Sequence, residues 1–286
     1  MIAGTRGSRL ALAQADIFKE AMAEFSVVPE IKIIRTAGDA DQLSDLRDMG
    51  GYGAFVRELD NALLAMEIDV SVNSMKDVPV LGRENIKIGA VLKRASCEDV
   101  ILPMPIKDLP RGAVVGSSSV RRSAILRSIR PDLKIKGLRG NVDTRLSKLD
   151  NGDYDAIILA KAGLERLGIK REMHTLSADE FVPAPGQGAI AIACRSSDEA
   201  VTEILKRIDD ATARAETEAD RTIMRMMGGI CSSPIGINAK KEKDGLRIRA
   251  VFFDGADIRR YDSVIPVDHT TQDLHYVVAR LRGETK

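Results

Sequence analysis

Aromatic residues are scarce in this 286-residue chain, which contains no tryptophan, six phenylalanines and four tyrosines. Platforms that stack bases are built from aromatic rings, so the shortage disfavours a single-strand nucleic-acid binder. Uninterrupted apolar runs of about 18 residues, which a membrane-spanning helix needs, are also missing. No basic stretch followed by an apolar core opens the sequence, so no secretory signal is visible. We therefore expect a cytoplasmic protein without nucleic-acid or membrane partners.

Cysteine and histidine are equally sparse, with three residues of each. Cys97, Cys194 and Cys231 form no Cys-x-x-Cys pair, and the histidines do not cluster with them. An odd number of cysteines without an export signal favours reduced thiols over a disulfide framework. The spacing gives no support to a zinc site, and we predict no metal.

Charge is balanced over the whole chain but concentrated in one part of it. The 43 Lys and Arg against 42 Asp and Glu give a formal net charge of +1. Residues 111–148 hold ten Lys or Arg and two Asp, which makes this segment strongly basic. The segment could bind a small anion, form a solvated face or bind RNA, and the aromatic shortage disfavours RNA.

Short β-rich runs alternate with helical patterns, which predicts an α/β protein. The apolar fraction of 44% is enough for a packed core. The predicted strands are Ile2–Thr5, Lys32–Thr36, Val70–Val72, Ile86–Val91, Ala113–Gly116, Leu133–Gly137, Ala156–Ala160 and Ala189–Arg195. The predicted helices are Ser8–Glu24, Ala54–Met66, Val120–Arg130, Val142–Asn151, Lys161–Leu167, a long stretch within Asp198–Met227, and Thr271–Leu281.

Two stretches interrupt this alternation and predict domain junctions. One lies around Lys93–Cys97, and the other is FVPAPGQG, whose prolines and glycines cannot continue a helix. A chain that leaves one domain and later returns to it would form a hinged cleft, a frequent place for a ligand. After Gly228 the pattern becomes that of a small α+β region. We predict domain 1 from residues 1–93 and 189–212, domain 2 from 94–188, and domain 3 from 213–286.

Two predicted strand-to-helix turns concentrate arginine where an anion would bind. The sequence GSSSVRR places serines at a helix N-cap beside Arg121 and Arg122, and the free amides of a first helical turn attract anions. The sequence LRGNVDTR places Arg139 and Arg145 around a second such turn. Each turn alone would also fit a capped helix with solvated arginines. Their coincidence favours a polyanionic small ligand.

Three further segments carry candidate side chains. In VSVNSMKDVP a strand ends at Lys76 and Asp77, which could form a surface ion pair or an acid–base device. In GTRGSRLALAQ, Arg6 and Ser8 lie between a strand and a helix. In GGICSSPIG, Cys231 lies on a glycine-rich turn, where a thiol can be an ordinary loop residue, an attachment site or a nucleophile.

Nine segments of the chain, in this order, resemble the porphobilinogen deaminase (hydroxymethylbilane synthase) family. They are GTRGSRLALAQ, RTAGD, GGYGAFVRELDNALL, SMKDVP, GSSSVRR, LRGNVDTRL, AGLERLG, PAPGQGA and GGICSSPIG. Each segment alone is weakly specific, but the ordered set extends over nearly the whole chain. The resemblance implies two α/β lobes with mixed sheets, like those of type-2 periplasmic binding proteins, and a small α+β C-terminal domain.

The resemblance also implies a transferase of tetrapyrrole and heme biosynthesis. Such an enzyme joins four porphobilinogen molecules head to tail into linear hydroxymethylbilane and releases ammonia. It acts as a cytoplasmic monomer with one dipyrromethane cofactor, bound covalently by a thioether to the residue that matches Cys231. The catalytic carboxylate matches Asp77. The implied cofactor-binding residues are Cys231, Ser74, Lys76, Asp77, Ser117, Ser119, Arg121, Arg122, Arg139 and Gly188. The implied substrate-binding residues are Arg6, Ser8, Phe55, Arg145, Arg166 and Gln187.

Three positions depart from the family's pattern. Tyr52 stands where lysine is common, Ile230 replaces the glycine before the cysteine, and Asn73 stands where histidine is frequent. None of them is the aspartate or one of the binding arginines, so we expect activity to survive. The alternative is a non-catalytic two-lobed protein that binds a small organic anion. It accounts for the arginine-rich turns but not for Asp77, Cys231 or the third domain.

Overall fold

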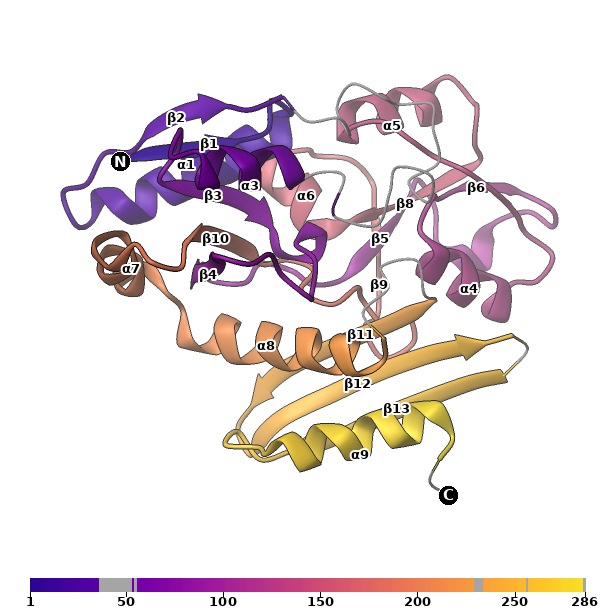
Figure 1. Ribbon diagram of the computed structural model, residues 1–286. Coiled ribbons are helices and arrows are strands. Elements are labelled where there is room, and N and C mark those ends of the chain that lie inside the picture. Colours follow the sequence, from indigo (N-terminus) through magenta and orange to yellow (C-terminus); the bar gives the residue numbers. More distant parts are fainter. Residues whose placement is uncertain (36–52, 54–55, 229–233, 256, 285–286) are drawn as a thin grey trace. The chain divides into compact units, whose positions relative to one another are not determined.

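The chain is seen in a computed structural model (Figure 1), which describes residues 1–35, 53, 56–228, 234–255 and 257–284. It divides into two compact units. The first consists of Met1–Ala95 and Gly188–Glu218, and the second of Ser96–Gln187 and Ala219–Lys286. The further separation of residues 213–286 as a third domain stays a prediction.

The first unit is built on a five-stranded sheet with the order β2-β1-β3-β10-β4. The central strand β3 is parallel to β1 on one side and antiparallel to β10 on the other. Phe18 and Met22 of the first helix are fully buried in the core with Val72 and Ile192. The strands are β1 (Ile2–Thr5), β2 (Glu30–Ile33), β3 (Val70–Ser74), β4 (Ile86–Val91) and β10 (Ile190–Arg195). The helices are α1 (Arg9–Ala23), α3 (Arg57–Leu64) and α7 (Glu199–Leu205), with the 3-10 turns η1 (Met75–Asp77) and η3 (Lys206–Ile208).

The second unit contains another five-stranded sheet, with the order β7-β6-β8-β5-β9. Its core is formed by buried residues such as Ile101, Val115, Ile125 and Ile158. The strands are β5 (Asp99–Leu102), β6 (Val114–Gly116), β7 (Lys134–Lys136), β8 (Ala156–Ala160) and β9 (His174–Leu176). The helices are α4 (Val120–Ile129), α5 (Val142–Asp150) and α6 (Lys161–Arg166), with the 3-10 turn η2 (Ile106–Asp108).

The two five-stranded sheets share one plan of strand directions. In each, three neighbouring strands are parallel, and the fourth position is antiparallel to both of its neighbours, β10 in one sheet and β5 in the other. In each, the second strand of that order leads into a helix capped by a serine, Ser8 for α1 and Ser119 for α4. The sequence shows no repeat, so only the topology makes these two helix N-termini equivalent.

The second unit also holds a three-stranded antiparallel sheet with the order β11-β12-β13. Helix α9 packs against β13, where Tyr261 and Tyr276 meet edge to face with ring centroids 6.5 Å apart (Figure 1). These strands are β11 (Ile235–Glu242), β12 (Gly245–Asp254) and β13 (Asp257–Ile265). Helix α9 (Thr271–Arg282) belongs to this unit, whereas helix α8 (Ala211–Met226) begins in the first unit and ends in the second.

These elements confirm the predicted α/β fold with two mixed sheets and a small α+β region. Three predicted strands agree residue for residue with β1, β4 and β8. The strands β5 and β9 were not predicted. Strand β5 is short and begins with Asp99, a charged residue that is buried only through tertiary contacts. The long helical stretch expected before Met227 is two helices, since Asp209 is extended and Asp210 caps α8 by accepting from the Ala213 amide. None of the helices seen in the described part of the chain is long and apolar enough to cross a membrane.

Candidate active site and anion-binding turns

Asp77 lies at the end of η1, which directly follows the central strand β3. Met75 fixes this turn, because its side chain is buried and its amide donates to the Ala189 carbonyl over 3.0 Å. The Val78 amide closes the turn on the Met75 carbonyl, and Pro79 prevents the helix from continuing. The aspartate therefore projects from the carboxyl end of a central strand, which is the edge where α/β sheets bind ligands.

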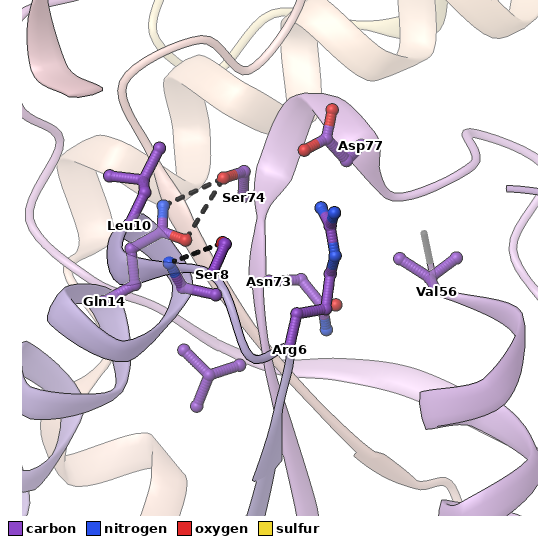
Figure 2. A pocket seen from close by; sticks show the side chains of 10 residues that line it. Arg6, Ser8, Leu10, Gln14, Val56, Asn73, Ser74 and Asp77 are labelled. Carbon is purple, nitrogen blue, oxygen red and sulfur yellow. Dashed lines mark hydrogen bonds between the residues drawn. The ribbon is translucent and has the colours of Figure 1, made fainter. Parts of the chain in front are cut away.

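A pocket of the first unit gathers side chains from the segments after β1 and β3 (Figure 2). In Figure 2 the side chain of Arg6 extends toward the turn that carries Asp77. Four of the predicted site residues meet here, namely Arg6, Ser8, Ser74 and Asp77. The other residues that line the pocket are Leu10, Ala11, Gln14, Val56, Val72 and Asn73. The pocket thus combines a guanidinium, a carboxylate and hydroxyl groups within one unit.

Gln14 is a pocket residue that was not predicted from the sequence. Its Nε2 donates to Ser74 Oγ over 2.9 Å, and the same hydroxyl lies 3.3 Å from Gln14 Oε1. The dashed lines of Figure 2 show both contacts. Gln14 is 3% exposed on the buried face of α1, among Ala11, Ala15 and Phe18. A polar residue on an otherwise apolar helix stripe is the signal that could have identified it.

Asn73 also lines this pocket, at the position where the family frequently has histidine. Its side chain is buried, and its Nδ2 donates to Ser71 Oγ over 2.9 Å. The amide therefore donates to a neighbouring residue of β3 and, unlike a histidine, offers no titratable group.

In the second unit, serine hydroxyls hold together the two turns that carry arginine. Ser119 caps α4 by accepting from the Arg122 amide, and Ser117 Oγ accepts from the Ser119 amide over 3.3 Å. The Ser118 hydroxyl donates to the Leu138 carbonyl and accepts from the Leu138 amide, both at 2.9 Å. This reciprocal pair places the turn after β6 beside the turn that contains Arg139.

Arg121 and Arg122 are buried, with 5% and 7% of their surfaces exposed. Both pair with Asp99, the first residue of β5: Arg121 Nη2 lies 2.8 Å from Oδ2, and Arg122 Nη2 lies 2.6 Å from Oδ1. Arg121 Nη1 also donates to the Val182 carbonyl, and Arg122 Nη1 to the Ile158 carbonyl. The turn is a capped helix, as one interpretation had it, but the part of that interpretation that leaves its arginines solvated is wrong.

The carboxylate of Asp99 is held in its charged form. Burial by itself raises the pKa of Asp99, but the charges of Arg121 and Arg122 and hydrogen bonds from Arg122 and Gln187 outweigh it. The pKa of Asp99 consequently lies well below its ordinary value. Removing one partner of such a buried pair costs about 3–5 kcal/mol, because the remaining charge stays uncompensated.

This pKa predicts how the variant Asp99→Asn responds to acid. A carboxylate whose folded-state pKa is depressed stabilises the fold above its unfolded pKa of about 3.9, and this contribution disappears as the pH falls through the folded-state value. The native chain should therefore be more stable than Asp99→Asn at pH 6, and the difference should shrink below about pH 4. Denaturant unfolding at several pH values measures it. A difference that grows in acid would contradict the assignment.

The other predicted residues of the second unit lie at its turns. Gly140 has φ of +104°, and a Cβ there would meet Thr144, so the turn after Arg139 requires glycine. Arg145 Nε donates back to the Gly140 carbonyl over 2.7 Å. Arg166 ends α6, and burial lowers its pKa to about 10.

Gln187 and Gly188 lie where the chain passes from the second unit to the first. Gln187 is 1% exposed, and its Nε2 donates to the Cys97 carbonyl over 2.7 Å and to Asp99 Oδ1 over 2.9 Å. The Gly188 carbonyl accepts from the Ala95 amide. Lys76 lies half-buried within η1, before Asp77. Cys231 and Phe55 lie outside the described residues, as do Tyr52 and Ile230.

The fold is that of an α/β protein with two mixed sheets, each of which leads into a serine-capped helix at Ser8 or Ser119. A family model described as "Porphobilinogen deaminase, dipyromethane cofactor binding domain" matches residues 1–203. The chain belongs to the porphobilinogen deaminase family.

Curated relatives match almost the whole chain. The "Probable porphobilinogen deaminase" of Methanosarcina acetivorans is 43% identical over 275 residues, covering 93% of this chain and 86% of that protein. The porphobilinogen deaminase of Nitrobacter hamburgensis is 41% identical over 268 residues, covering 91% and 85%. Among solved structures, a periplasmic substrate-binding protein of an ABC transporter from Coxiella burnetii is 12% identical with a TM-score of 0.45, over 75% of this chain and 94% of that chain.

The description of the matched family model names a dipyrromethane cofactor. The residues present in this chain fit that cofactor. Its pyrroles carry carboxylates, and guanidinium groups bind carboxylates with two parallel hydrogen bonds. The Nε of Arg121 is buried and has no hydrogen-bond partner among the described residues. With Asp99 the Arg121–Arg122 pair keeps one net positive charge. An anionic group would satisfy the charge that the protein leaves unbalanced here.

Proposed function

We propose that this chain is an active porphobilinogen deaminase that forms hydroxymethylbilane from four porphobilinogen molecules, with Asp77 as its catalytic residue. The observation that carries the proposal is the convergence of Arg6, Ser74 and Asp77 in one pocket at the carboxyl end of β3. An anion binder needs the guanidinium and the hydroxyl. It does not need a carboxylate beside them, since a carboxylate repels an anionic ligand.

Asp77 stabilises the positive charge that develops when the substrate loses its amino group. The carbon–nitrogen bond of the protonated aminomethyl group breaks, neutral ammonia leaves with the electron pair, and the pyrrole nitrogen takes up the positive charge. A carboxylate at the pyrrole N–H lowers the energy of this cation. Cys231 would hold the dipyrromethane, which would supply a nucleophilic α-carbon. Asp77 can then accept the proton that the attacked carbon loses.

The cationic residues bind the acetate and propionate groups of the pyrroles. Arg6 lies in the pocket of Asp77, where it can orient the incoming substrate by one carboxylate. Arg139, Arg145 and Arg166 belong to the other unit and are assigned to the same ligand class. Bidentate pairs fix orientation as well as charge, which a stepwise condensation requires at every addition.

The same proposal includes three finer points. The chain acts as a cytoplasmic monomer, and it carries one cofactor. Its domains are residues 1–93 with 189–212, 94–188 and 213–286. Each point is implied by the family resemblance of the nine ordered segments.

Intact-mass measurement before and after incubation with porphobilinogen tests the proposal. The purified chain should carry an excess mass of two linked pyrroles, and further pyrrole units should appear on it before hydroxymethylbilane is released. Ammonia should be released in step. A chain that binds porphobilinogen reversibly without any mass increase would be the non-catalytic anion binder instead.

Gln14→Leu should lower the efficiency of the enzyme without unfolding it. The change removes both hydrogen-bonding partners that Gln14 offers to Ser74 Oγ, while the volume stays similar. Because an unoriented hydroxyl binds substrate less well, we expect kcat/KM for porphobilinogen to fall about tenfold, the value of one net hydrogen bond. Gln272→Leu, at an exposed position of helix α9, is the matched control and should leave kcat/KM unchanged. An unchanged kcat/KM in Gln14→Leu would remove Gln14 from the site.

A further inference from the structure

Asp99 is a fully buried carboxylate that the proposed chemistry has not used. Its exposed fraction is 0%, and it pairs with Leu176 and Ala160 at the start of β5. Each of its oxygens receives a guanidinium: Oδ2 from Arg121 at 2.8 Å, and Oδ1 from Arg122 through Nη2 at 2.6 Å and Nε at 3.1 Å. A single side chain thus determines where two neighbouring arginines of α4 lie.

The surroundings of Asp99 hold it in one orientation. Gln187 Nε2 donates to Oδ1 over 2.9 Å, and the same nitrogen donates to the Cys97 carbonyl. Backbone carbonyls hold the same two guanidinium groups, because Arg121 Nη1 donates to Val182 and Arg122 Nη1 donates to Ile158. Arg121 also lies over the Phe181 ring, with its guanidinium carbon 5.9 Å from the centroid. Hydrogen bonds and one ring contact, from residues at separate places along the chain, therefore hold this network together.

The charge of the cluster is not balanced. Two guanidinium groups face one carboxylate, so one positive charge remains in a region with almost no solvent. Two adjacent arginines without Asp99 would repel each other and turn toward solvent. Within this cluster, Arg121 Nε is buried and has no hydrogen-bond partner among the described residues. The network therefore leaves both a charge and a donor for an anion.

We propose that Asp99 is a positioning residue for anion binding: it aligns Arg121 and Arg122 so that their remaining positive charge receives a carboxylate of the pyrrole chain. The inference rests on the proposed function and deepens it by naming the group that prepares the cofactor-binding arginines. A buried ion pair is a weak source of stability compared with apolar residues of the same volume. Its value here lies in preorganisation, because arginines that are already aligned need no reordering when the ligand binds.

Cofactor loading tests this role separately from turnover. The full chain and its variants are expressed in cells that cannot make porphobilinogen, then exposed to equal amounts of it, and the fraction that carries two linked pyrroles is read by intact mass. Asp99→Asn should load at least about tenfold more slowly than the native chain, because the loss of one partner of a buried ion pair weakens binding by at least that factor. Asp132→Asn is the matched control, because Asp132 also receives a two-pronged arginine, Arg130, at 2.8 Å on each oxygen. It should load at the native rate.

A second variant separates positioning from charge balance, and it also serves if Asp99→Asn does not fold. The double variant Asp99→Asn/Arg122→Gln has the same net cluster charge as the native chain, whereas Arg122→Gln alone is neutral. If Asp99 only balanced charge, the double variant would load as fast as Arg122→Gln or faster. If Asp99 aligns Arg121, the double variant loads more slowly than Arg122→Gln. Circular dichroism and thermal unfolding establish that both are folded.

The outcomes distinguish the two proposals. If the native chain acquires two linked pyrroles and Asp99→Asn acquires them at the same rate, the positioning role is overturned and the proposed function remains intact. A native chain that gains no pyrrole mass overturns the proposed function itself.

Discussion

Asp77→Asn should reduce the turnover of porphobilinogen by at least about a thousandfold while leaving two linked pyrroles attached. Removing a group that stabilises transition-state charge costs about 10²–10³ in rate, and the loss of general-base assistance adds to this. Asparagine keeps the size of the side chain, so η1 and the Met75 anchor should remain as they are. Single-turnover release of ammonia measures the chemical step, and intact mass measures the attached pyrroles.

The matched control for Asp77→Asn is Asp150→Asn. Asp150 is an exposed carboxylate in a two-pronged pair with Arg171, at 2.5 and 2.8 Å, and takes no part in the site. This variant should turn over at the native rate. Asp77→Asn with ammonia release close to native would transfer catalysis to another group. Loss of the attached pyrroles in that variant would instead assign Asp77 to cofactor assembly.

Cys231→Ala should give a folded chain with no covalently attached pyrrole and no sustained turnover. The thiol is the only atom that the resemblance offers as the anchor, so its removal leaves the growing chain untethered. Intact mass should equal the value calculated from the sequence, and incubation with porphobilinogen should add nothing stable. The expected effect is complete, because attachment is covalent rather than a matter of affinity.

The other two cysteines provide the controls. Cys194 is fully buried in β10, and burial raises the pKa of its thiol, which disfavours the nucleophilic thiolate. Cys97 is partly exposed, and Cys97→Ala should keep the attached pyrroles. An excess mass of two pyrroles in Cys231→Ala would place the anchor at one of these two residues.

The local elements of this fold could be predicted from the sequence because their signals are local. Serine caps at Ser8 and Ser119 mark helix starts through hydrogen bonds to amides three residues on. A continuous apolar run delimited β8, and short β-rich runs delimited β1 and β4. Arginine at the two turns after β6 and β7 indicated an anion, since free amides and guanidinium groups favour the same charge. Nine ordered segments then sufficed to indicate the family.

The partners of these residues were decided only by the tertiary structure. Asp99 lies 22 and 23 positions from the two arginines that it aligns, and 88 from Gln187. Gln14 and Ser74 are 60 positions apart. No periodicity links such residues, because the order of strands in a sheet, and not the spacing along the chain, brings them together. The sequence by itself therefore determined which residue types meet a polyanion, and packing decided which of their charges are held inside the protein and which one is left for the ligand.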